Sequence, residues 1–514
     1  MKLFQSNSEK SYQSHENLLD TPLYEVPGTK TIITWADAVE GTLITGSTGS
    51  GKSSGAGKHA ALAMLKAGFG FCVLCAKPDE KDRWVEYAKA TGREKDLIIF
   101  NKASGLEFNF LEYEMQRKGE GAGDVFNTNN ALMNLRDITR LSLSGSGGNN
   151  QDPYWDESLK DLISSIISLL ALAGEEISIS NMRKLATTSF IEEEAKHYNN
   201  LVRTITTERG IDPQKREEAR IELAEWIASN YFIQVFHKMQ SRDLTEKEQE
   251  DAGTTEDFWL NEFARLSEKT RSIIVQSFMG MINPFKYDGI LKNQFAAGLS
   301  EDLLPENIIE QKKIVIVDFP LKKFGLAGRF AATIYKCEFQ GAMQRRKVNE
   351  EPAPKPACLF IDEYQAFCNP QGDSDFQAMA RSSWAATMYI TQNLNNLYCI
   401  MGGHNARAMA KSLLGNLNLK FFASNADFET NRWASEMIGQ HIVDFQNLNI
   451  DKDMQISKSK NQQLQFRVTP DHFTVLKTGR KANNYVVETI VFKAGKTWGS
   501  DQQNFALVDF NQRK

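Results

Sequence analysis

The stretch that decides the fold is Thr42-Leu-Ile-Thr-Gly-Ser-Thr-Gly-Ser-Gly-Lys-Ser53, which joins a short apolar segment to a glycine-rich turn. Residues 46–53 satisfy the pattern G-x-x-x-x-G-K-[ST] in full, and apolar residues at helical spacing follow from Lys52 to about Ala67. A strand, a glycine-rich loop and a helix in this order are the setting in which the pattern binds phosphate. The sequence therefore predicts a phosphate-binding loop at the end of a buried strand.

Each part of this loop has a physical role in holding a triphosphate. Glycines let successive backbone amides turn toward phosphate oxygens, and the N-terminus of the following helix adds partial positive charge. We expect Lys52 to reach the β- and γ-phosphates of ATP and the Ser53 hydroxyl to bind Mg²⁺. The predicted nucleotide-binding residues are Gly46, Ser47, Thr48, Gly49, Ser50, Gly51, Lys52, Ser53 and Ser54.

A second apolar run, Ala357-Cys-Leu-Phe-Ile-Asp-Glu363, ends in two carboxylates. At the tip of a strand, Asp362 would hold Mg²⁺ through its water shell, and Glu363 would orient and polarise the attacking water. A nucleotide kinase transfers phosphate to a bound acceptor and has no need of the second carboxylate. The Asp-Glu pair therefore favours ATP hydrolysis over phosphate transfer.

Two polar residues flank the next predicted strand, Thr387–Thr391. Gln392 follows the strand, and neighbouring strands of a parallel sheet end at one edge, so we expect Gln392 beside the γ-phosphate as a sensor of hydrolysis. A capping amide is the alternative. Arg381 precedes the strand, and we interpret it as a guanidinium presented to the ATP of a neighbouring subunit, where such a group is worth about 10³-fold or more in rate. An ordinary surface arginine is the alternative.

Strand and helix signals alternate at both ends of the chain but not in its middle. Strands are predicted at 70–74, 97–100, 313–319, 357–361, 387–391 and 418–424, with short strands between 466 and 510. Helices are predicted at 81–90, 152–173, 181–186, 192–208, 213–239, 255–266 and 267–282, a flexible loop at 142–150 and a solvated loop at 238–256. Such alternation is typical of a parallel sheet built from βαβ units. We expect an α/β fold whose mainly parallel sheet is interrupted by an all-α domain, with boundaries at 1–40, 41–125, 126–295 and 296–514.

Composition narrows the functional classes. The 60 Lys and Arg against 65 Asp and Glu give a formal charge of −5, so any nucleic-acid contact must come from a local basic surface. No apolar run reaches the roughly 18–20 residues of a membrane helix, and the polar N-terminus lacks a signal-peptide core. These features predict a cytoplasmic protein. Of six cysteines, Cys72 and Cys75 form a C-x-x-C pair in an apolar run, where we expect structural thiols; a metal or redox site is the alternative.

The ordered set of motifs resembles the type IV coupling proteins, the conjugative DNA-transfer ATPases of the HerA–FtsK superfamily. Besides the phosphate loop, Asp362 and Glu363, the matching blocks are Val73-Leu-Cys-Ala-Lys77, Leu106-Glu-Phe-Asn-Phe110, Asp152-Pro-Tyr-Trp-Asp-Glu-Ser158, Arg381 and residues 390–397. The chain departs from the family where Cys75-Ala-Lys-Pro78 replaces Asp-Pro-Lys-Gly, so only Lys77 carries over. It also has only 45 residues before Gly46, where family members usually begin with membrane-spanning helices.

The resemblance implies a RecA-like P-loop ATPase that forms a ring, usually a hexamer, with ATP at subunit boundaries and DNA moving through the centre. It implies that the all-α insertion selects cargo and that the partners are DNA and a relaxase or other secretion or transfer proteins. Docking at the inner face of the membrane would then need a partner. Trp155, Trp384 and Phe324 are candidates for stacking on single-stranded bases. An ordinary core or surface position is the alternative, and the more common one. Two alternatives remain: an ATP-gated platform that recruits protein without translocating DNA, and a relative that processes or packages DNA with a separate nuclease.

Overall fold

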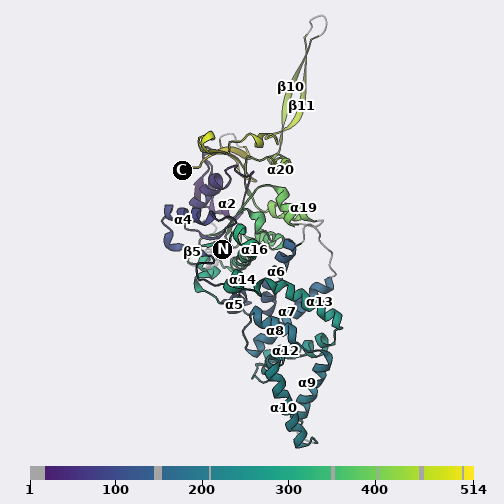
Figure 1. The fold of residues 1–514 in the computed structure, drawn as a ribbon. Helices are drawn as coiled ribbons and strands as arrows, with labels where there is room; N and C mark the ends of the chain where they lie inside the picture. Colours follow the sequence, from purple (N-terminus) through teal and green to yellow (C-terminus); the bar gives the residue numbers. More distant parts are fainter. Residues whose placement is uncertain are drawn as a thin grey trace, which may run out of the picture. The chain divides into compact units, whose positions relative to one another are not determined.

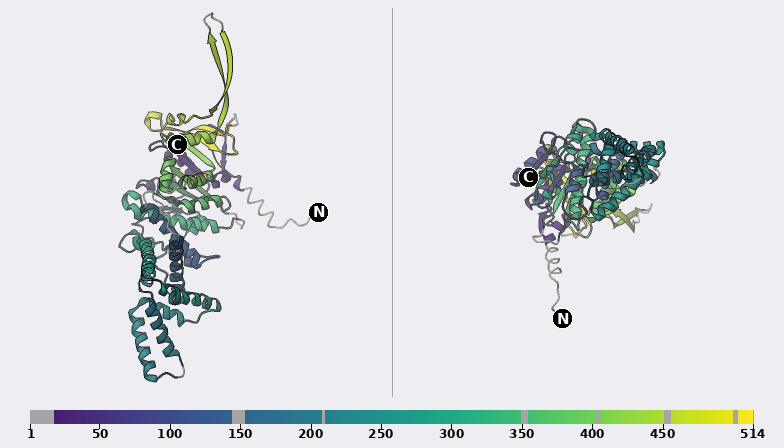
Figure 2. Two further views of the ribbon diagram at one scale, coloured as in Figure 1. Left: turned by 90° about the vertical axis from the view of Figure 1, so that its right-hand side faces the viewer. Right: turned by 90° about the horizontal axis from the view of Figure 1, so that it is seen from below.

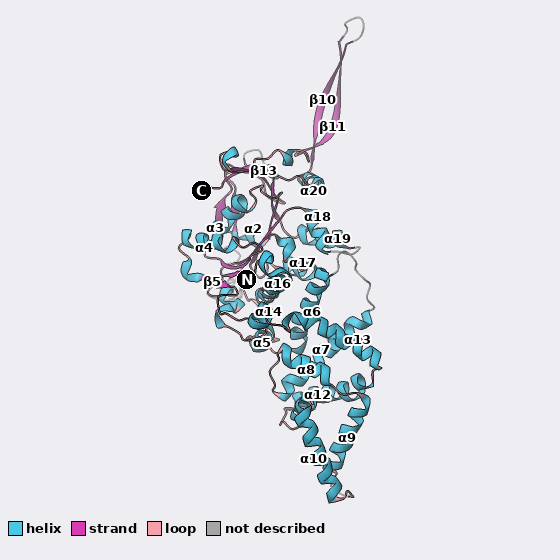
Figure 3. Ribbon diagram, in the orientation of Figure 1, coloured by secondary structure: helices cyan, strands magenta, loops and turns pink. Residues whose placement is uncertain are grey.

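The computed structural model describes residues 18–143, 153–207, 210–348, 354–401, 405–450, 456–499 and 503–513. The chain divides into two compact units (Figure 1). One comprises Met1–Ser104, Ser144–Gly148 and Asp302–Lys514, and the other comprises residues 105–143 and 149–301. The strands of the sheet belong to the first unit, whereas helices build the second (Figure 3).

The first unit is organised around a central sheet of nine strands within the described ranges, in the order β13-β12-β9-β3-β8-β7-β4-β6-β5. The strands are β3 (Thr42–Thr45), β4 (Gly70–Leu74), β5 (Leu97–Phe100), β6 (Ile314–Val317), β7 (Ala357–Asp362), β8 (Ala385–Thr391), β9 (Leu419–Ala423), β12 (Val486–Lys493) and β13 (Phe505–Asn511). The seven strands from β9 to β5 pair in parallel, and β12 and β13 add an antiparallel edge. The α/β fold with a mainly parallel sheet and a helical insert is therefore confirmed.

Apolar runs without alternation explain the parallel strands, because helices cover both faces of such a sheet. Every residue of β3, β4, β6, β7, β8 and β9 is buried. The helices of this unit are α2 (Trp35–Val39), α3 (Lys58–Lys66), α4 (Glu80–Ala90), α15 (Pro305–Ile309), α16 (Leu321–Arg345), α17 (Pro370–Met379), α18 (Leu394–Met401), α19 (Ala406–Gly415) and α20 (Phe428–Ile438). The predicted helix after the phosphate loop begins as a π-helical turn, Ser53–Gly57, before α3.

The second unit packs its helices around an aromatic core. They are α5 (Phe110–Gln116), α6 (Val125–Leu143), α7 (Pro153–Ala173), α8 (Ile179–Thr188), α9 (Glu192–Thr206), α10 (Pro213–Ser229), α11 (Tyr231–Gln240), α12 (Glu246–Asp257), α13 (Glu268–Ile282) and α14 (Ile290–Phe295). Phe190, Phe232, Phe236 and Trp259 are buried against one another, with ring centroids 4.9–5.6 Å apart. This cluster gives the insert its own core.

Two predictions within the insert are wrong. Residues 213–239 form two helices, because Asn230 leaves helical geometry and its side chain caps α11 by accepting a hydrogen bond from the Ile233 amide at 3.2 Å. The segment 238–256, predicted to be a solvated loop, contains α12, which a Thr245–Glu248 capping box starts. Ala252 of α12 is buried, so this charged sequence still presents a packed face. The loop predicted at 142–150 lies outside the described residues after Leu143.

Two antiparallel pairs were not predicted. A short hairpin joins β1 (Pro22–Glu25) to β2 (Ile32–Thr34). A long ribbon joins β10 (Gln440–Ile450) to β11 (Ile456–Phe466), and it pairs with no other strand in the part of the chain that the structure describes. Figure 2 shows this ribbon extending away from the sheet. No helix among the described residues combines the length and apolar character needed to cross a membrane.

Candidate active site

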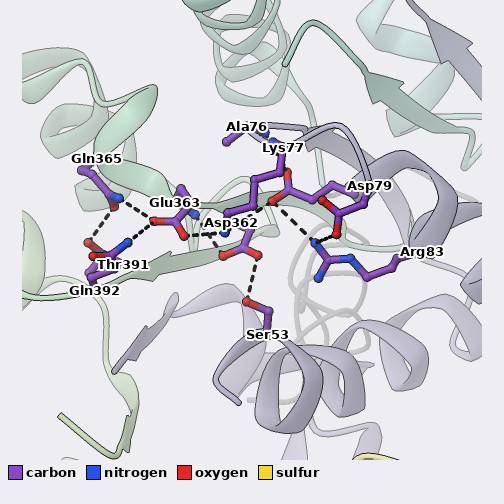
Figure 4. Close-up of polar contacts among 11 residues, drawn as sticks. Ser53, Ala76, Lys77, Asp79, Arg83, Asp362, Glu363, Gln365, Thr391 and Gln392 are labelled. Atoms are coloured by element: carbon purple, nitrogen blue, oxygen red, sulfur yellow. Dashed lines mark hydrogen bonds and ion pairs between the residues drawn. The ribbon is translucent and has the colours of Figure 1, made fainter. Parts of the chain in front are cut away.

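The candidate site lies at the carboxyl edge of the parallel sheet, where five strand ends meet. The phosphate loop follows β3, Gln392 follows β8, Asp362 ends β7, Lys77 follows β4 and Asn425 follows β9. Because β8 lies between β3 and β7, Gln392 stands between the phosphate loop and the two carboxylates. Figure 4 shows how Ser53, Lys77, Asp362, Glu363 and Gln392 lie at this edge. Parallel strands thus bring together residues more than 300 positions apart in the sequence.

The phosphate loop has the backbone geometry that its glycines predict. Gly51 has φ +83°, and a Cβ atom there would lie 2.4 Å from a methyl group of Val487, so no larger residue fits. Ser47 anchors the loop: its amide donates to the Ser424 carbonyl at 2.9 Å, and its hydroxyl accepts from the Ala426 amide at 3.0 Å. Within the described structure, the amides of Gly51 and its neighbour Lys52 have no protein acceptor, so they remain available to an anion.

Lys52 is buried in this loop near the two carboxylates of β7. Burial lowers the pKa of the Lys52 ammonium, and the negative charges of Glu363 and Asp362 oppose that effect. A buried ammonium group without full hydration interacts strongly with an incoming phosphate. The side chain therefore lies where a phosphate-binding lysine is expected.

Ser53 and Asp362 form the candidate magnesium site. The Ser53 Oγ donates a hydrogen bond to Asp362 Oδ2 at 2.8 Å. A hydroxyl has one proton and two lone pairs, so this bond directs the proton to the carboxylate and leaves the oxygen lone pairs for a cation. Magnesium prefers oxygen ligands and retains several waters, which a neighbouring carboxylate can orient. The two residues fit Mg²⁺ bound directly by Ser53 and through water by Asp362.

Glu363 follows β7 in the left-handed backbone region, with φ 58°, which turns its side chain away from the strand direction. Its Oε2 accepts hydrogen bonds from Gln365 Nε2 at 2.7 Å and from Gln392 Nε2 at 3.2 Å. Its Oε1 lies 2.5 Å from the Lys77 Nζ. Burial acts to raise the pKa of Glu363, but the hydrogen bond and charge of Lys77 outweigh it and hold the pKa below its usual value.

A buried network fixes the segment that follows Glu363. Asp373 Oδ2 accepts a hydrogen bond from the Tyr364 hydroxyl at 2.7 Å, and Asp373 Oδ1 lies 2.5 Å from the Lys336 Nζ. The Asp373 and Lys336 side chains are both 0% exposed. The Tyr364 ring stacks on Tyr389 of β8, with centroids 4.2 Å apart. This network ties the turn after the carboxylates to the strand that carries Gln392.

Arg381 lies away from the phosphate loop of its own chain. It precedes β8, so it stands at the amino edge of the strands, and its Nε lies 4.0 Å from Glu40, which precedes β3. Its side chain is 66% exposed. The structure therefore brings Lys52, Asp362 and Gln392 to one edge and Arg381 to the opposite edge.

Several residues at the site were given no role there from the sequence, although Lys77 was noted as the one residue shared with the family's Asp-Pro-Lys-Gly block. Lys77 and Gln365 both contact Glu363. Arg480 lies beside the loop, because a Cβ atom on Gly49 would be 3.0 Å from its guanidinium. Gln512 accepts from the Arg480 amide at 2.8 Å and donates to the Ser54 hydroxyl at 2.7 Å. The glycine before Arg480 was the available signal, but it does not indicate which loop Arg480 approaches.

The structure also bears on the sequence hypotheses about metal-binding clusters, the cysteine pair and the base-stacking residues. The described residues contain no cluster of three or more His, Cys, Asp or Glu side chains able to hold a metal ion. Cys72 and Cys75 are buried, and burial raises the pKa of both thiols, as expected of structural cysteines. Trp384 is only 4% exposed and belongs to the core beneath the sheet, so the alternative of a core residue holds and Trp384 is not available for base stacking.

Part of the chain that carries this site matches a known protein family. Residues 356–477 match the family model described as the TraM recognition site of TraD and TraG. That segment contains Asp362, Glu363, Arg381 and Gln392. A search of curated proteins found no significant match in sequence.

Solved structures of the plasmid coupling protein TrwB share the fold over nearly the whole chain. Its complex with a non-hydrolysable ATP analogue has a TM-score of 0.57 at 14% identity, covering 98% of this chain and 94% of that one. The unbound form of this conjugative coupling protein has a TM-score of 0.55 at 13% identity, covering 97% of this chain and 92% of that one. The TrwB complex with ADP and Mg²⁺ has a TM-score of 0.54 at 14% identity, covering 98% of this chain and 92% of that one. The resemblance to coupling proteins is thus confirmed as a shared fold.

Proposed function

We propose that this protein is an ATP-hydrolysing ring motor of the type IV coupling kind, which moves DNA or a DNA–protein complex in conjugative transfer or secretion. The observation that carries the proposal is the cluster of Ser53, Asp362, Glu363 and Gln392 beside Lys52, at the carboxyl edge of a sheet with the TrwB fold. Two TrwB structures are described as complexes with an ATP analogue and with ADP and Mg²⁺, which supports nucleotide as the ligand here.

The mechanism assigns one role to each side chain. The loop amides and Lys52 bind the phosphates, and Ser53 with Asp362 holds the metal ion. Bound Mg²⁺ would supply charge neutralisation at the β- and γ-phosphates. Glu363 orients and polarises the attacking water. Gln392 bonds Glu363 and its carbonyl accepts from the Gly46 amide at 3.3 Å, so it links the loop to the base and is placed to respond when the γ-phosphate leaves.

The position of Arg381 supports the proposed ring. An exposed guanidinium at the amino edge of the strands cannot serve the phosphate loop at the carboxyl edge of the same sheet. In a ring whose subunits place these edges against each other, Arg381 of one subunit reaches the ATP of the next. We take the ring to be a hexamer, as in the family that the sequence resembles.

The proposed cargo and partners are inferred from the resemblance to type IV coupling proteins. We assign DNA as the cargo and a relaxase or other transfer proteins as partners, with recruitment to the inner face of the membrane through a partner. The match of residues 356–477 to a TraM recognition site supports a docking role for this part of the chain. The formal charge of −5 means that DNA contacts come from local loops.

ATP hydrolysis by the purified full chain tests the proposal. We expect Mg²⁺-dependent hydrolysis that single- or double-stranded DNA accelerates and that Lys52→Ala abolishes. Hydrolysis without DNA stimulation, together with no DNA binding at low salt, would contradict the motor. Absence of nucleotide binding in the wild type would overturn the enzyme assignment itself.

The second candidate is an ATP-gated recruitment platform without translocation, which the match to a recognition-site model favours. A Glu363→Gln variant distinguishes the two. Under the platform proposal, the ATP-trapped variant still captures its protein partner and supports function. Under the motor proposal, capture persists but strand movement in a translocation assay is lost.

A further inference from the structure

Both carboxylate oxygens of Glu363 accept hydrogen bonds from protein donors in this structure. Lys77 occupies Oε1 at 2.5 Å, and the amides of Gln365 and Gln392 occupy Oε2 at 2.7 and 3.2 Å. A general base must accept a hydrogen bond from the attacking water. Each carboxylate oxygen can accept two hydrogen bonds, so the three protein donors leave one acceptor site, on Oε1 beside the Lys77 ammonium. Departure of Lys77 would open the whole of Oε1 to the attacking water.

Lys77 is the donor best placed to leave. Its backbone is fixed, because Glu80 Oε2 accepts hydrogen bonds from the amides of Ala76 and Lys77 at 2.7 and 3.2 Å. The Glu80 side chain is 4% exposed, whereas the Lys77 side chain is 38% exposed. Figure 4 shows the Lys77 side chain reaching Glu363 from this turn. A long, partly exposed side chain on a fixed backbone can change its partner without moving the loop.

The charges around Lys77 give the exchange a direction. Lys52 and Lys77 face Asp362 and Glu363, and the Glu80 carboxylate lies 4.0 Å from the Lys77 ammonium. A terminal phosphate bears more negative charge than a single carboxylate, and its oxygens are strong hydrogen-bond acceptors. A γ-phosphate bound beside Lys52 therefore competes with Glu363 for the Lys77 ammonium, whereas ADP brings no such group.

We propose that Lys77 is a γ-phosphate-responsive latch: it holds Glu363 while the site is without ATP, and transfers to the γ-phosphate when ATP binds, which frees Glu363 Oε1 for the attacking water. The water oxygen then bonds to the γ-phosphorus as the bond to the β–γ bridging oxygen breaks. The water proton passes to Glu363, and ADP and phosphate leave. Glu363 is thereby released to act as the base only in sites that hold ATP. The inference rests on the proposed ATPase function.

The test compares binding of a non-hydrolysable ATP analogue with binding of ADP, both with Mg²⁺, to the full chain. A contact to a charged phosphate is worth at least about tenfold in affinity, so we expect Lys77→Met to weaken analogue binding by that factor and to leave ADP binding unchanged. We also expect kcat to fall. Lys81→Met is the matched control, because this nearby lysine pairs with Asp82 rather than with the site.

A structural ion pair would give a different result. Loss of Lys77 would then shift analogue and ADP affinities together or leave both unchanged, which would overturn the latch. Lys77→Gln serves as a second variant, because glutamine keeps a hydrogen-bond donor for Glu363 but removes the charge. We expect it to lose the preference for ATP, and full retention of that preference would also overturn the proposal. If the wild type hydrolyses ATP and both variants match it, the latch fails and the ATPase stands; if the wild type binds no nucleotide, the ATPase assignment fails first.

Discussion

The Ser53 hydroxyl donates a 2.8 Å hydrogen bond to Asp362, although the two residues are 309 positions apart. One lies after β3 and the other ends β7, and β8 separates these strands in the sheet. The contact therefore depends on the complete parallel sheet and not on local sequence. It makes the metal-binding half of the site sensitive to the order of the strands.

Ser53→Ala should separate metal-dependent from metal-independent binding. Removal of the hydroxyl takes away a direct Mg²⁺ ligand, so we expect ATP hydrolysis to fall by roughly 10²-fold or more and the Mg²⁺ enhancement of nucleotide affinity to disappear. Affinity for nucleotide in excess EDTA should change little. Titrations with and without Mg²⁺ measure this, and Ser53→Thr, which restores a hydroxyl, should recover most of the activity.

Glu363→Gln should uncouple binding from hydrolysis. Glutamine has nearly the same shape as glutamate but cannot take a proton from water, so we expect hydrolysis to fall by about 10²–10⁴-fold. Because the variant also removes a negative charge near the γ-phosphate, ATP affinity should be retained or increased. Single-turnover hydrolysis and equilibrium binding are the two measurements. A variant that loses binding and hydrolysis in parallel would contradict the role of Glu363 as the base.

Arg381→Ala should impair hydrolysis across a subunit boundary. We expect a loss of about 10³-fold in kcat with nucleotide affinity largely kept, because the guanidinium would stabilise charge that develops in the transition state. Mixing this variant with Lys52→Ala should restore part of the activity, since a mixed ring contains sites with an intact loop from one subunit and an intact arginine from its neighbour. Arg432→Ala, which removes an exposed arginine paired with Glu436 on the same helix, is the control.

No restoration on mixing would mean that Arg381 acts only within its own subunit or not at all. If the protein is a monomer, its measured mass will be that of one chain under every nucleotide condition, in agreement with that result. The two measurements together decide whether the opposite-edge position of Arg381 has a catalytic meaning.

The sequence was sufficient for the parts of the site that depend on strand order. Continuous apolar runs marked β3, β7 and β8, and polar residues directly after them had to meet at one edge. The contact between Gln392 and Glu363 follows from that rule alone. Gly51 could also be predicted, because phosphate binding by backbone amides requires its positive φ.

The remaining features depend on side-chain geometry or on long-range packing. The pairing of Lys77 with Glu363 needs the turn held by Glu80, and the sequence Cys75-Ala-Lys-Pro78 gives no sign of it. The ribbon β10–β11 carries many amide side chains, and none of its described side chains at 440–446 and 460–466 is buried, so the usual strand signal is weak. Arg480 reaches the phosphate loop only through the antiparallel edge strands, whose register cannot be read from local pattern.

Asp373→Ala should destabilise the protein through the buried network after Glu363. The substitution leaves the Lys336 ammonium buried without its carboxylate, and loss of one partner of a buried pair costs about 3–5 kcal/mol. We expect a clear fall in Tm and a disproportionate loss of kcat, because the Tyr364 turn that positions Glu363 loses its anchor. Thermal unfolding and steady-state kinetics check this. The double change Lys336→Met with Asp373→Leu should recover part of the stability.

Lys420 on β9 should make stability depend on pH in the alkaline range. Its side chain is buried, and burial, with repulsion from Lys493, lowers its pKa from 10.5 to about 8. Between these two values the unfolded chain binds a proton that the folded protein does not, so this group adds stability as pH rises from about 8 to 10.5. Below pH 8 the buried ammonium costs up to about 3 kcal/mol relative to a neutral group. Lys420→Met should therefore raise Tm most at pH 7, and its advantage over the wild type should shrink by pH 10. An advantage that is constant with pH would show that the charge of Lys420 is not what destabilises the strand.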